Sequence, residues 1–179
     1  MGAPDRKWSG VCGGGALIFV TVGHQMPFDR LVRGVDAWAA RSSRDDVFAQ
    51  IGTTDYQPEH IAYADRVGPA EFRQRISEAD AVVAHAGMGT ILTALELGTP
   101  VLVMPRLGRL IETRNDHQVA TAERFKALGR VEVAMDETEL PGALDRLAGL
   151  QRGPTIDAKA SPELLAAVRS FIFGHEQPK

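Results

Sequence analysis

The sequence is poor in cysteine and in aromatic residues. Its 179 residues include one cysteine, Cys12, so neither an intrachain disulfide nor a cluster of thiolate metal ligands can form. A lone cysteine is consistent with a protein of the reducing cytoplasm. Aromatic residues make up 6% of the chain, but the 44% of hydrophobic and 24% of charged residues are ordinary globular values. Disordered and fibrous architectures are therefore disfavoured.

Excess positive charge and long apolar runs are missing as well. The chain carries 20 basic and 23 acidic residues, a net charge of -3, so we expect no binding to nucleic acid. The most apolar stretch, residues 16–22, is much too short to span a bilayer and lacks the flanks of a signal peptide. We therefore expect a cytoplasmic protein whose association with a membrane is peripheral.

Several catalytic fingerprints are also absent. No GxGxxG follows the first apolar run, where the chain reads TVGHQMPF, which leaves a nicotinamide-dependent oxidoreductase as a weak alternative. The phosphate loop GxxxxGK[ST] of nucleoside triphosphatases is missing, as are the hydrolase motifs GxSxG and HExxH.

What the sequence does contain is a regular alternation of apolar runs and helical patterns. Near-continuous apolar runs between turns predict strands that are buried on both faces, and helical spacing between them predicts βαβ units. The predicted strands are residues 16–22, 46–51, 61–67, 81–86, 100–105 and 130–135. The predicted helices are residues 31–38, 69–78, 90–97, 115–128 and 137–149, with Gly98 and Gly129 as stop signals. The fold class is therefore α/β, with a Rossmann-like doubly wound parallel sheet.

This pattern divides the chain into three parts. Residues 1–15 form a Gly-rich flexible leader, residues 16–150 form one nucleotide-binding domain, and residues 151–179 form a linker and a last amphipathic helix. One face of that helix carries Leu164, Leu165, Val168, Phe171 and Ile172. This apolar face either docks onto a partner protein or packs onto the domain's own sheet.

The sequence AVVAHAGMGT places chemistry at the end of a predicted strand. His85 ends the strand, Gly87 and Gly89 follow, and Thr90 begins the next helix. Glycines let a phosphate approach the backbone closely, and a helix N-terminus offers unpaired N–H groups and the positive end of a dipole. The loop therefore predicts a diphosphate site. The alternative is a tight turn beside a structural histidine.

The string HAGMGTILTALELGTPVLVMP followed by NDHQ, with VTVG and PFDRLV upstream, resembles the C-terminal domain of family 28 glycosyltransferases. The similarity runs from about Ile18 to Leu128 and is greatest to the soluble donor-binding subunits of split enzymes, both bacterial exopolysaccharide transferases and the eukaryotic dolichol-linked N-acetylglucosaminyltransferase. It implies the donor-binding, C-terminal half of a GT-B fold. By this resemblance the UDP-sugar contacts come from Gly23 and from a loop made of His85, Gly87, Met88, Gly89 and Thr90.

The resemblance extends to the sugar and ribose contacts, with one departure. Asp116 and Gln118 match an acidic or amide pair that related enzymes direct at the sugar hydroxyls. The alternative is that Asn115 and Asp116 only cap the next helix. Thr93 stands where related domains often carry an acidic ribose ligand. Glu96 lies one turn further along the same predicted helix, and acts either as a replacement for that ligand or as a solvated charge.

The catalytic base is not identified by the sequence. His24 follows the first predicted strand and is a weak candidate, because the base of inverting GT-B enzymes usually comes from the other domain. Arg106, Arg109 and Arg114 lie after the fifth predicted strand, where they would neutralise an anionic substrate or remain solvated.

These observations together predict the donor-binding subunit of an inverting hexosyltransferase. It would transfer sugar from a UDP-sugar to a lipid-linked saccharide acceptor in polysaccharide or glycolipid synthesis, together with a membrane-anchored acceptor-binding subunit. No Asp-x-Asp element is present, so we expect no metal, and no cofactor is expected. A non-catalytic UDP-binding regulatory subunit with the same pocket is the alternative.

Overall fold

A single parallel sheet organises the computed structural model, which describes residues 17–129, 131–147 and 149–155. The sheet's strand order is β3-β2-β1-β4-β5-β6, and all of these strands are parallel. The strands are β1 (Ile18–Thr21), β2 (Val47–Gln50), β3 (Ala62–Ala64), β4 (Ala81–His85), β5 (Val101–Met104) and β6 (Glu132–Val133). This arrangement is the doubly wound order of Rossmann-like domains.

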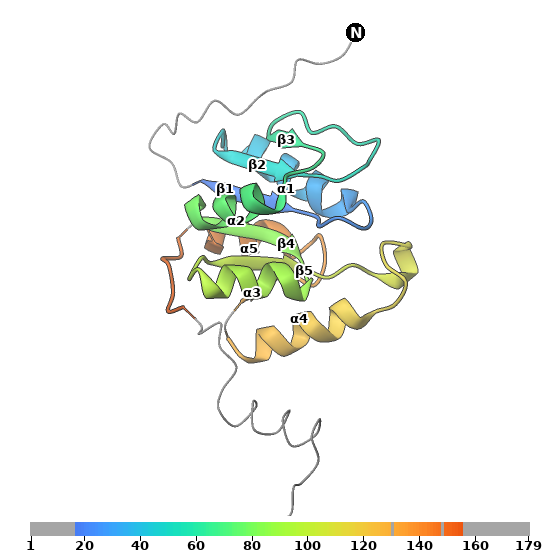
Figure 1. The fold of residues 1–179 in the computed structure, drawn as a ribbon. Coiled ribbons are helices and arrows are strands. Elements are labelled where there is room, and N and C mark those ends of the chain that lie inside the picture. Colours follow the sequence, from blue (N-terminus) through green and yellow to red (C-terminus); the bar gives the residue numbers. More distant parts are fainter. Residues whose placement is uncertain (1–16, 130, 148, 156–179) are drawn as a thin grey trace, which may run out of the picture.

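Helices cover both faces of this sheet (Figure 1). Helices α1 and α5 pack on one face, and α2, α3 and α4 pack on the other. Their bounds, with one short 3-10 turn, are α1 (Asp29–Arg41), α2 (Pro69–Glu78), α3 (Met88–Glu96), η1 (Gly108–Leu110), α4 (His117–Ala127) and α5 (Leu140–Leu147).

The core follows from the alternation of side chains along each strand. Ile18 and Val20 of β1 point towards α1 and α5, whereas Phe19 between them joins the core on the opposite face. Leu31 and Val35 of α1 are fully buried at helical spacing against the first of these faces. Each buried side chain of this kind contributes about 1.5–3 kcal/mol, so both faces of the sheet stabilise the fold.

A buried carboxylate fixes the long connection between β2 and β3. Asp36 of α1 is 4% exposed and accepts hydrogen bonds from the Tyr56 hydroxyl (2.8 Å) and from the backbone N–H groups of Glu59, His60 and Ile61. Burial and the neighbouring Asp36 raise the pKa of Tyr56 to about 12, so this hydroxyl keeps its proton. The segment is therefore held against α1 despite having little regular structure of its own.

The structure confirms the predicted fold class, and it corrects element boundaries. Helix α3 begins at Met88 and not at Thr90, because Gly87 adopts the extended N-cap conformation and the next residues already form the first turn. Strand β6 has two residues, fewer than expected from residues 130–135, since it lies at the edge of the sheet. The predicted leader and the helix at residues 161–174 lie outside the described residues. In the part described, no helix is long and apolar enough to cross a bilayer.

Candidate functional site

The candidate site lies where the strand order changes direction. Strands β1 and β4 are neighbours, and the crossovers that leave them run to opposite sides of the sheet. Loops that follow such strands diverge and leave a crevice for a ligand. His85 ends β4 and Gly23 lies two residues beyond β1, so both lie at this point.

The imidazole of His85 occupies space that two glycines leave free. A Cβ atom at Gly23 would lie 2.6 Å from Nε2 of His85, and one at Gly87 would lie 2.0 Å from Cε1. Real Cβ atoms do not approach other atoms this closely. Gly23 also has a φ of +77°, which favours glycine for a second reason. The sequence pattern Gly-His after β1 and His-Ala-Gly after β4 therefore builds a slot for one histidine ring.

The environment of His85 keeps its ring neutral. Burial and the nearby positive charge of Arg106 lower the pKa of His85 to about 4, although the contact with Gln118 works in the opposite direction. Its Nδ1 atom is buried and has no hydrogen-bond partner among the described residues. A buried nitrogen without a partner is uncommon, and a bound ligand is one way in which it is satisfied.

The N-terminus of α3 begins immediately after this ring. The first intrahelical hydrogen bond runs from Ile91 N to Gly87 O at 3.2 Å, so the N–H groups of Met88, Gly89 and Thr90 have no partner within the helix. A Cβ atom added at Gly89 would meet nothing within 4 Å. Open space over unpaired N–H groups at the positive end of a helix dipole suits an anion.

Thr90 and Thr93, the two threonines of the predicted site, differ in the surroundings of their side chains. Thr90 is buried in the first turn of α3 at 6% exposure. The hydroxyl of Thr93 donates to the backbone carbonyl of Gly89 at 2.8 Å, so its own hydrogen is used inside the helix. Glu96 pairs with Arg73 of α2 at 3.2 Å, at the opposite end of α3 from the anion-binding turn. That position gives no support to Glu96 as a replacement ribose ligand.

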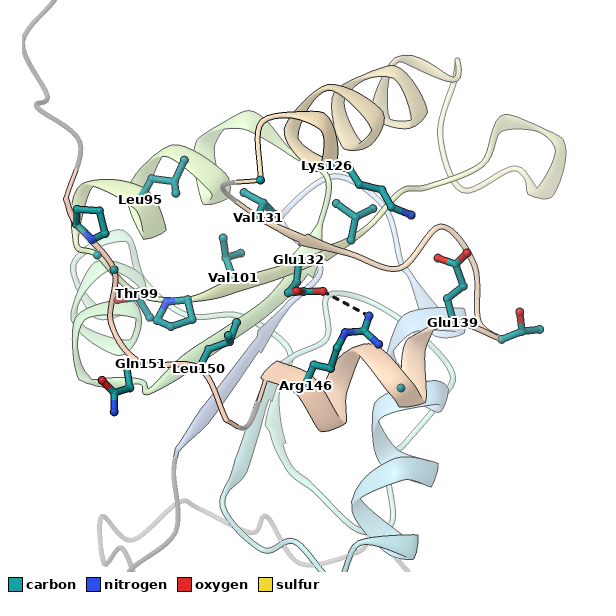
Figure 2. A pocket seen from close by; sticks show the side chains of 18 residues that line it. Leu95, Thr99, Val101, Lys126, Val131, Glu132, Glu139, Arg146, Leu150 and Gln151 are labelled. Carbon is teal, nitrogen blue, oxygen red and sulfur yellow. Dashed lines mark hydrogen bonds and ion pairs between the residues drawn. The ribbon is translucent and has the colours of Figure 1, made fainter.

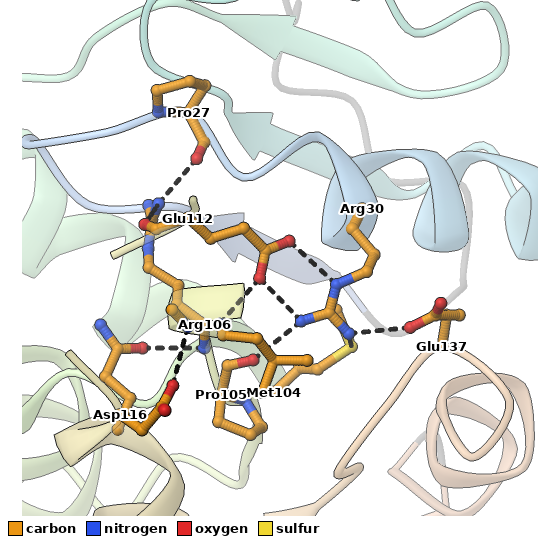
Figure 3. Close-up of polar contacts among 11 residues, drawn as sticks. Pro27, Arg30, Met104, Pro105, Arg106, Glu112, Asp116 and Glu137 are labelled. Atoms are coloured by element: carbon orange, nitrogen blue, oxygen red, sulfur yellow. Dashed lines mark hydrogen bonds and ion pairs between the residues drawn. The ribbon is translucent and has the colours of Figure 1, made fainter. Parts of the chain in front are cut away.

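Arg106 is buried, so it is not the solvated charge that the sequence left open as one alternative, while a role in neutralising an anionic substrate stays a prediction. It is 4% exposed, and its guanidinium donates to the carbonyls of Val22, Met26 and Pro27, each at 2.6 Å. A further bond reaches the carbonyl of Glu112 at 3.0 Å. Burial lowers the pKa of Arg106 to about 10, which still leaves it charged at neutral pH. One side chain thereby joins the β1–α1 loop to the β5–α4 loop (Figure 3).

A second arginine fixes the β5–α4 loop from the other side. Arg30 of α1 makes two parallel bonds of 2.9 Å to the carboxylate of Glu112 and a further bond of 2.8 Å to Glu137 (Figure 3). Burial alone would lower the pKa of Arg30, but the two carboxylates raise it above its ordinary value. Glu112 also accepts a bond from Leu107 N at 2.9 Å. Because such bidentate pairs are geometrically specific, they set the path of the loop.

A small cavity of about 100 Å³ lies between these loops. Of the residues predicted from the sequence, it brings together His24, His85 and Gln118. Gln118 is 7% exposed, and its side-chain oxygen accepts a bond from Arg106 N at 3.2 Å. Arg106, which the sequence indicated as a candidate, also lines the cavity, as does His117, the residue between the predicted Asp116 and Gln118. The sequence did not indicate the remaining lining residues, which are Val22, Gln25, Met26, Glu112 and Thr113.

Asp116 is not part of this cavity lining. Its carboxylate accepts a hydrogen bond from Gly108 N at 2.7 Å and makes no side-chain cap to α4. One oxygen of the predicted sugar ligand therefore already supports the β5–α4 loop. The carboxylate itself is exposed, so its second oxygen remains accessible. His24 is also exposed, at the rim of the cavity.

A larger groove of about 890 Å³ lies at the β6 edge of the sheet, away from His85 (Figure 2). Its lining includes Leu95, Val101, Arg146 and Leu150, and the last described segment, residues 150–154, runs along its side. Within the part of the chain that the structure describes, none of the predicted site residues lines this groove. It is therefore distinct from the site at the switch point.

The fold and the site define an α/β domain in which a helix N-terminus, a neutral and partly buried imidazole, and two loops joined by Arg106 lie at the switch point of the sheet. The model of the glycosyltransferase family 28 C-terminal domain matches residues 17–163, and the chain belongs to this family. A search among curated proteins found no match. The family and the fold support the assignment of a donor-binding domain of a glycosyltransferase.

Solved structures have the same fold at low sequence identity. The kitacinnamycin glycotransferase is 23% identical, with a TM-score of 0.58 and coverage of 83% of this chain but 39% of its own. Os79 from O. sativa, in complex with UDP, is 12% identical, with a TM-score of 0.56 and coverage of 74% and 31%. The solution structure of ALG13 is 19% identical, with a TM-score of 0.55 and coverage of 89% and 98%. The chain thus spans about two fifths of the first of these and nearly all of ALG13.

Proposed function

We propose that this chain is the donor-binding subunit of an inverting glycosyltransferase that transfers a hexosyl group from a UDP-sugar to a lipid-linked acceptor. The observation that carries the proposal is the junction of β4 and α3. There the unpaired Nδ1 of His85 and the free N–H groups from Met88 to Thr90 lie on either side of Gly87. Neutral donors in this arrangement suit the diphosphate of a nucleotide-sugar.

The structure supports particular roles for the remaining residues. Gly89 leaves the helix start open for the β-phosphate, and Gly23 holds the imidazole in place from the β1 side. Gln118 lines the cavity and Asp116 stands two residues before it at the start of α4, and we assign both to the sugar hydroxyls. His24 lies at the cavity rim and is the residue that we assign to take a proton from an acceptor if this chain supplies the base.

The acceptor side of the reaction requires a second protein domain in this proposal. Inverting transfer needs an acceptor oxygen held in line with the sugar carbon, and a base beside it. The described residues form one nucleotide-binding domain, which matches less than half of the full-length enzymes such as the kitacinnamycin glycotransferase. For the acceptor side we propose a membrane-anchored, acceptor-binding subunit that closes over the loops after β1, β4 and β5 in polysaccharide or glycolipid synthesis.

Calorimetry with UDP in the presence of EDTA tests the donor site. We expect binding without a divalent metal, because the helix N-terminus supplies the positive potential. A competition panel of UDP-glucose, UDP-galactose, UDP-glucuronate and UDP-N-acetylglucosamine then identifies the sugar. His85→Ala should weaken UDP binding by about 1–3 kcal/mol, the range for a hydrogen bond to a charged group, and should spare the fold. Binding that requires magnesium, or a variant that binds UDP like the parent, would contradict the proposal.

A further inference from the structure

The tip of the β5–α4 loop exposes an apolar pair that the donor site does not use. Ile111 is 82% exposed and Leu110 is 44% exposed, next to the short turn η1. Figure 1 shows this loop, drawn in yellow, extending beyond the end of the sheet and beyond the start of α4. Single exposed apolar residues are normal on protein surfaces, so exposure alone decides nothing.

The backbone at Ile111 adds a second observation. Its φ is 59° and its ψ is 23°, which is the left-handed helical region. A β-branched residue is strongly disfavoured there, because its Cβ crowds the backbone, and glycine or asparagine is the usual choice. An isoleucine at this position therefore costs folding stability while its own side chain gains nothing from burial. Strained residues of this kind concentrate at binding sites.

The loop that carries Ile111 is not loose. The carboxylate of the next residue, Glu112, is held by Arg30 and by Leu107 N, and Asp116 accepts a bond from Gly108 N. Arg106 holds the carbonyl of Glu112 as well. The apolar pair is thus presented at a fixed position relative to the donor cavity, of which Glu112 and Thr113 form part of the wall.

The charges around the tip are positive. Arg109 and Arg114 flank the apolar pair in sequence, both are exposed, and neither makes an ion pair within the described residues. Of the acidic residues in this loop, Glu112 is paired with Arg30, whereas Asp116 keeps its negative charge because its partner, Gly108 N, is neutral. Arg109 and Arg114 together outweigh this single carboxylate, so the tip carries a net positive charge although the whole chain carries a net charge of -3.

We propose that the loop tip formed by Arg109, Leu110, Ile111 and Arg114 is a membrane contact that inserts its apolar pair between anionic lipid headgroups. Apolar side chains beside arginines partition into the interface, where the guanidinium groups meet lipid phosphates. Two apolar side chains and two arginines give weak membrane binding by themselves, so we expect this contact to act together with other contacts to the membrane. The tip borders the donor cavity, so this contact would orient the cavity towards a lipid-linked acceptor, a consequence that rests on the function proposed above.

A protein partner fits the same observations less well. The apolar area at the tip is two side chains, far from the extended surface that a stable protein interface buries. The loop extends beyond the end of the sheet (Figure 1), and an arginine stands on each side of the apolar pair in the sequence, an arrangement that suits the anionic surface of a membrane. Contact with a protein is nevertheless a distinct outcome of the experiment below.

Vesicle flotation with the purified full-length chain tests the proposal. The probes are vesicles of phosphatidylcholine alone and vesicles of phosphatidylcholine mixed with phosphatidylglycerol. We expect binding to the mixed vesicles, weakened about tenfold by Ile111→Asp. Replacing Arg109 and Arg114 together by Gln should weaken binding to the mixed vesicles but have no effect on neutral ones. Leu128→Asp is the matched control, since Leu128 is also exposed, at 55%, but lies at the end of α4.

Ile111→Gly separates membrane binding from folding. Glycine relieves the left-handed strain, so the melting temperature should stay equal or rise, while vesicle binding falls. UDP affinity should be unchanged in the Ile111 variants, so failure of this proposal is distinguishable from failure of the donor site. Equal vesicle binding by the parent, Ile111→Asp and Leu128→Asp would overturn it. So would an absence of vesicle binding by the parent, which would leave a protein partner as the explanation of the tip.

Discussion

At the residue scale, three glycines near the site have different physical reasons for being glycine. Gly23 and Gly87 are required by the His85 ring, because an added Cβ would lie 2.6 Å and 2.0 Å from its atoms. Gly89 has no such neighbour within 4 Å. Its hydrogen therefore faces open space, which is the position we assign to the diphosphate.

This difference between the glycines predicts that one substitution, at Gly89, keeps or raises the stability of the fold but weakens UDP binding. Gly89→Ala should leave the melting temperature equal or higher, since alanine favours the helix, but weaken UDP binding about tenfold or more by blocking the N–H groups. Gly68→Ala is the control. Gly68 is the N-cap of α2, and an added Cβ would also meet nothing within 4 Å, but α2 is not part of the donor site. Thermal unfolding and calorimetry measure both quantities. Unchanged UDP affinity in Gly89→Ala would remove the helix start from the donor site.

The partly buried imidazole of His85 predicts a dependence of stability on pH. The folded pKa of His85 is about 4 and its ordinary value is 6.5, so the unfolded chain binds the proton more readily between these values. The contribution of His85 is therefore complete above pH 6.5 and is lost as the pH falls towards 4, at up to about 1.4 kcal/mol per pH unit. Urea unfolding should show a steeper acid decline for the parent than for His85→Gln. Parallel curves would contradict this prediction.

Single residues also show where sequence patterns stop being informative. His85 and its glycines stand in one contiguous motif, so their proximity could be predicted from the sequence. Arg106 could not be assigned, because its partners Val22, Met26 and Pro27 are about 80 residues away in the chain, and backbone carbonyls leave no sequence signal. Glu112 and Arg30 are separated by a similar number of residues, and in the sequence each of them looks like an ordinary solvated charge.

At the element scale, the order of strands and helices was predictable because buried parallel strands give continuous apolar runs. The residues at which these strands and helices begin and end were less predictable. Helix α3 begins two residues early because Gly87 serves as its N-cap without a side-chain cap, which a search for Ser, Thr, Asp or Asn does not detect. The paired loops after β1 and β5 have no periodicity at all, and their shape follows from Arg106 and Glu112.

Arg106 therefore carries a prediction about these two loops. Arg106→Lys should lower the free energy of unfolding by about 2–4 kcal/mol, because an ammonium group cannot reach carbonyls on both loops and leaves buried acceptors unpaired. Hydrogen exchange should increase at residues 22–27 in particular, and UDP affinity should fall as the loop beside His85 loosens. Arg109→Lys is the control, since Arg109 is exposed and its donors hold no loop. Equal exchange in both variants would show that the loops are fixed by other contacts.

At the scale of the whole molecule, the two concave regions lie at different places on one sheet. The switch-point cavity opens between the loops after β1, β4 and β5, where an acceptor-binding subunit would close over the donor. The groove at β6 is bordered by residues 150–154, the last described segment (Figure 2). The helix predicted at residues 161–174 lies outside the described residues, so both alternatives for its apolar face remain predictions.

The last prediction is that the purified chain binds UDP but transfers no sugar alone. Donor binding needs only groups that the domain holds by itself, namely His85 and the start of α3. Transfer needs in addition an acceptor oxygen positioned to attack and a base to take its proton, and alignment of this kind accounts for several orders of magnitude in rate. A radiolabelled UDP-sugar and a lipid-linked acceptor should therefore give no product until an acceptor-binding membrane subunit is added. His85→Ala, mixed with that subunit, should lose most of the restored activity, which ties the activity to this chain. Robust transfer by the purified chain, with no second protein present, would refute the division of the enzyme into two subunits while leaving the donor site intact.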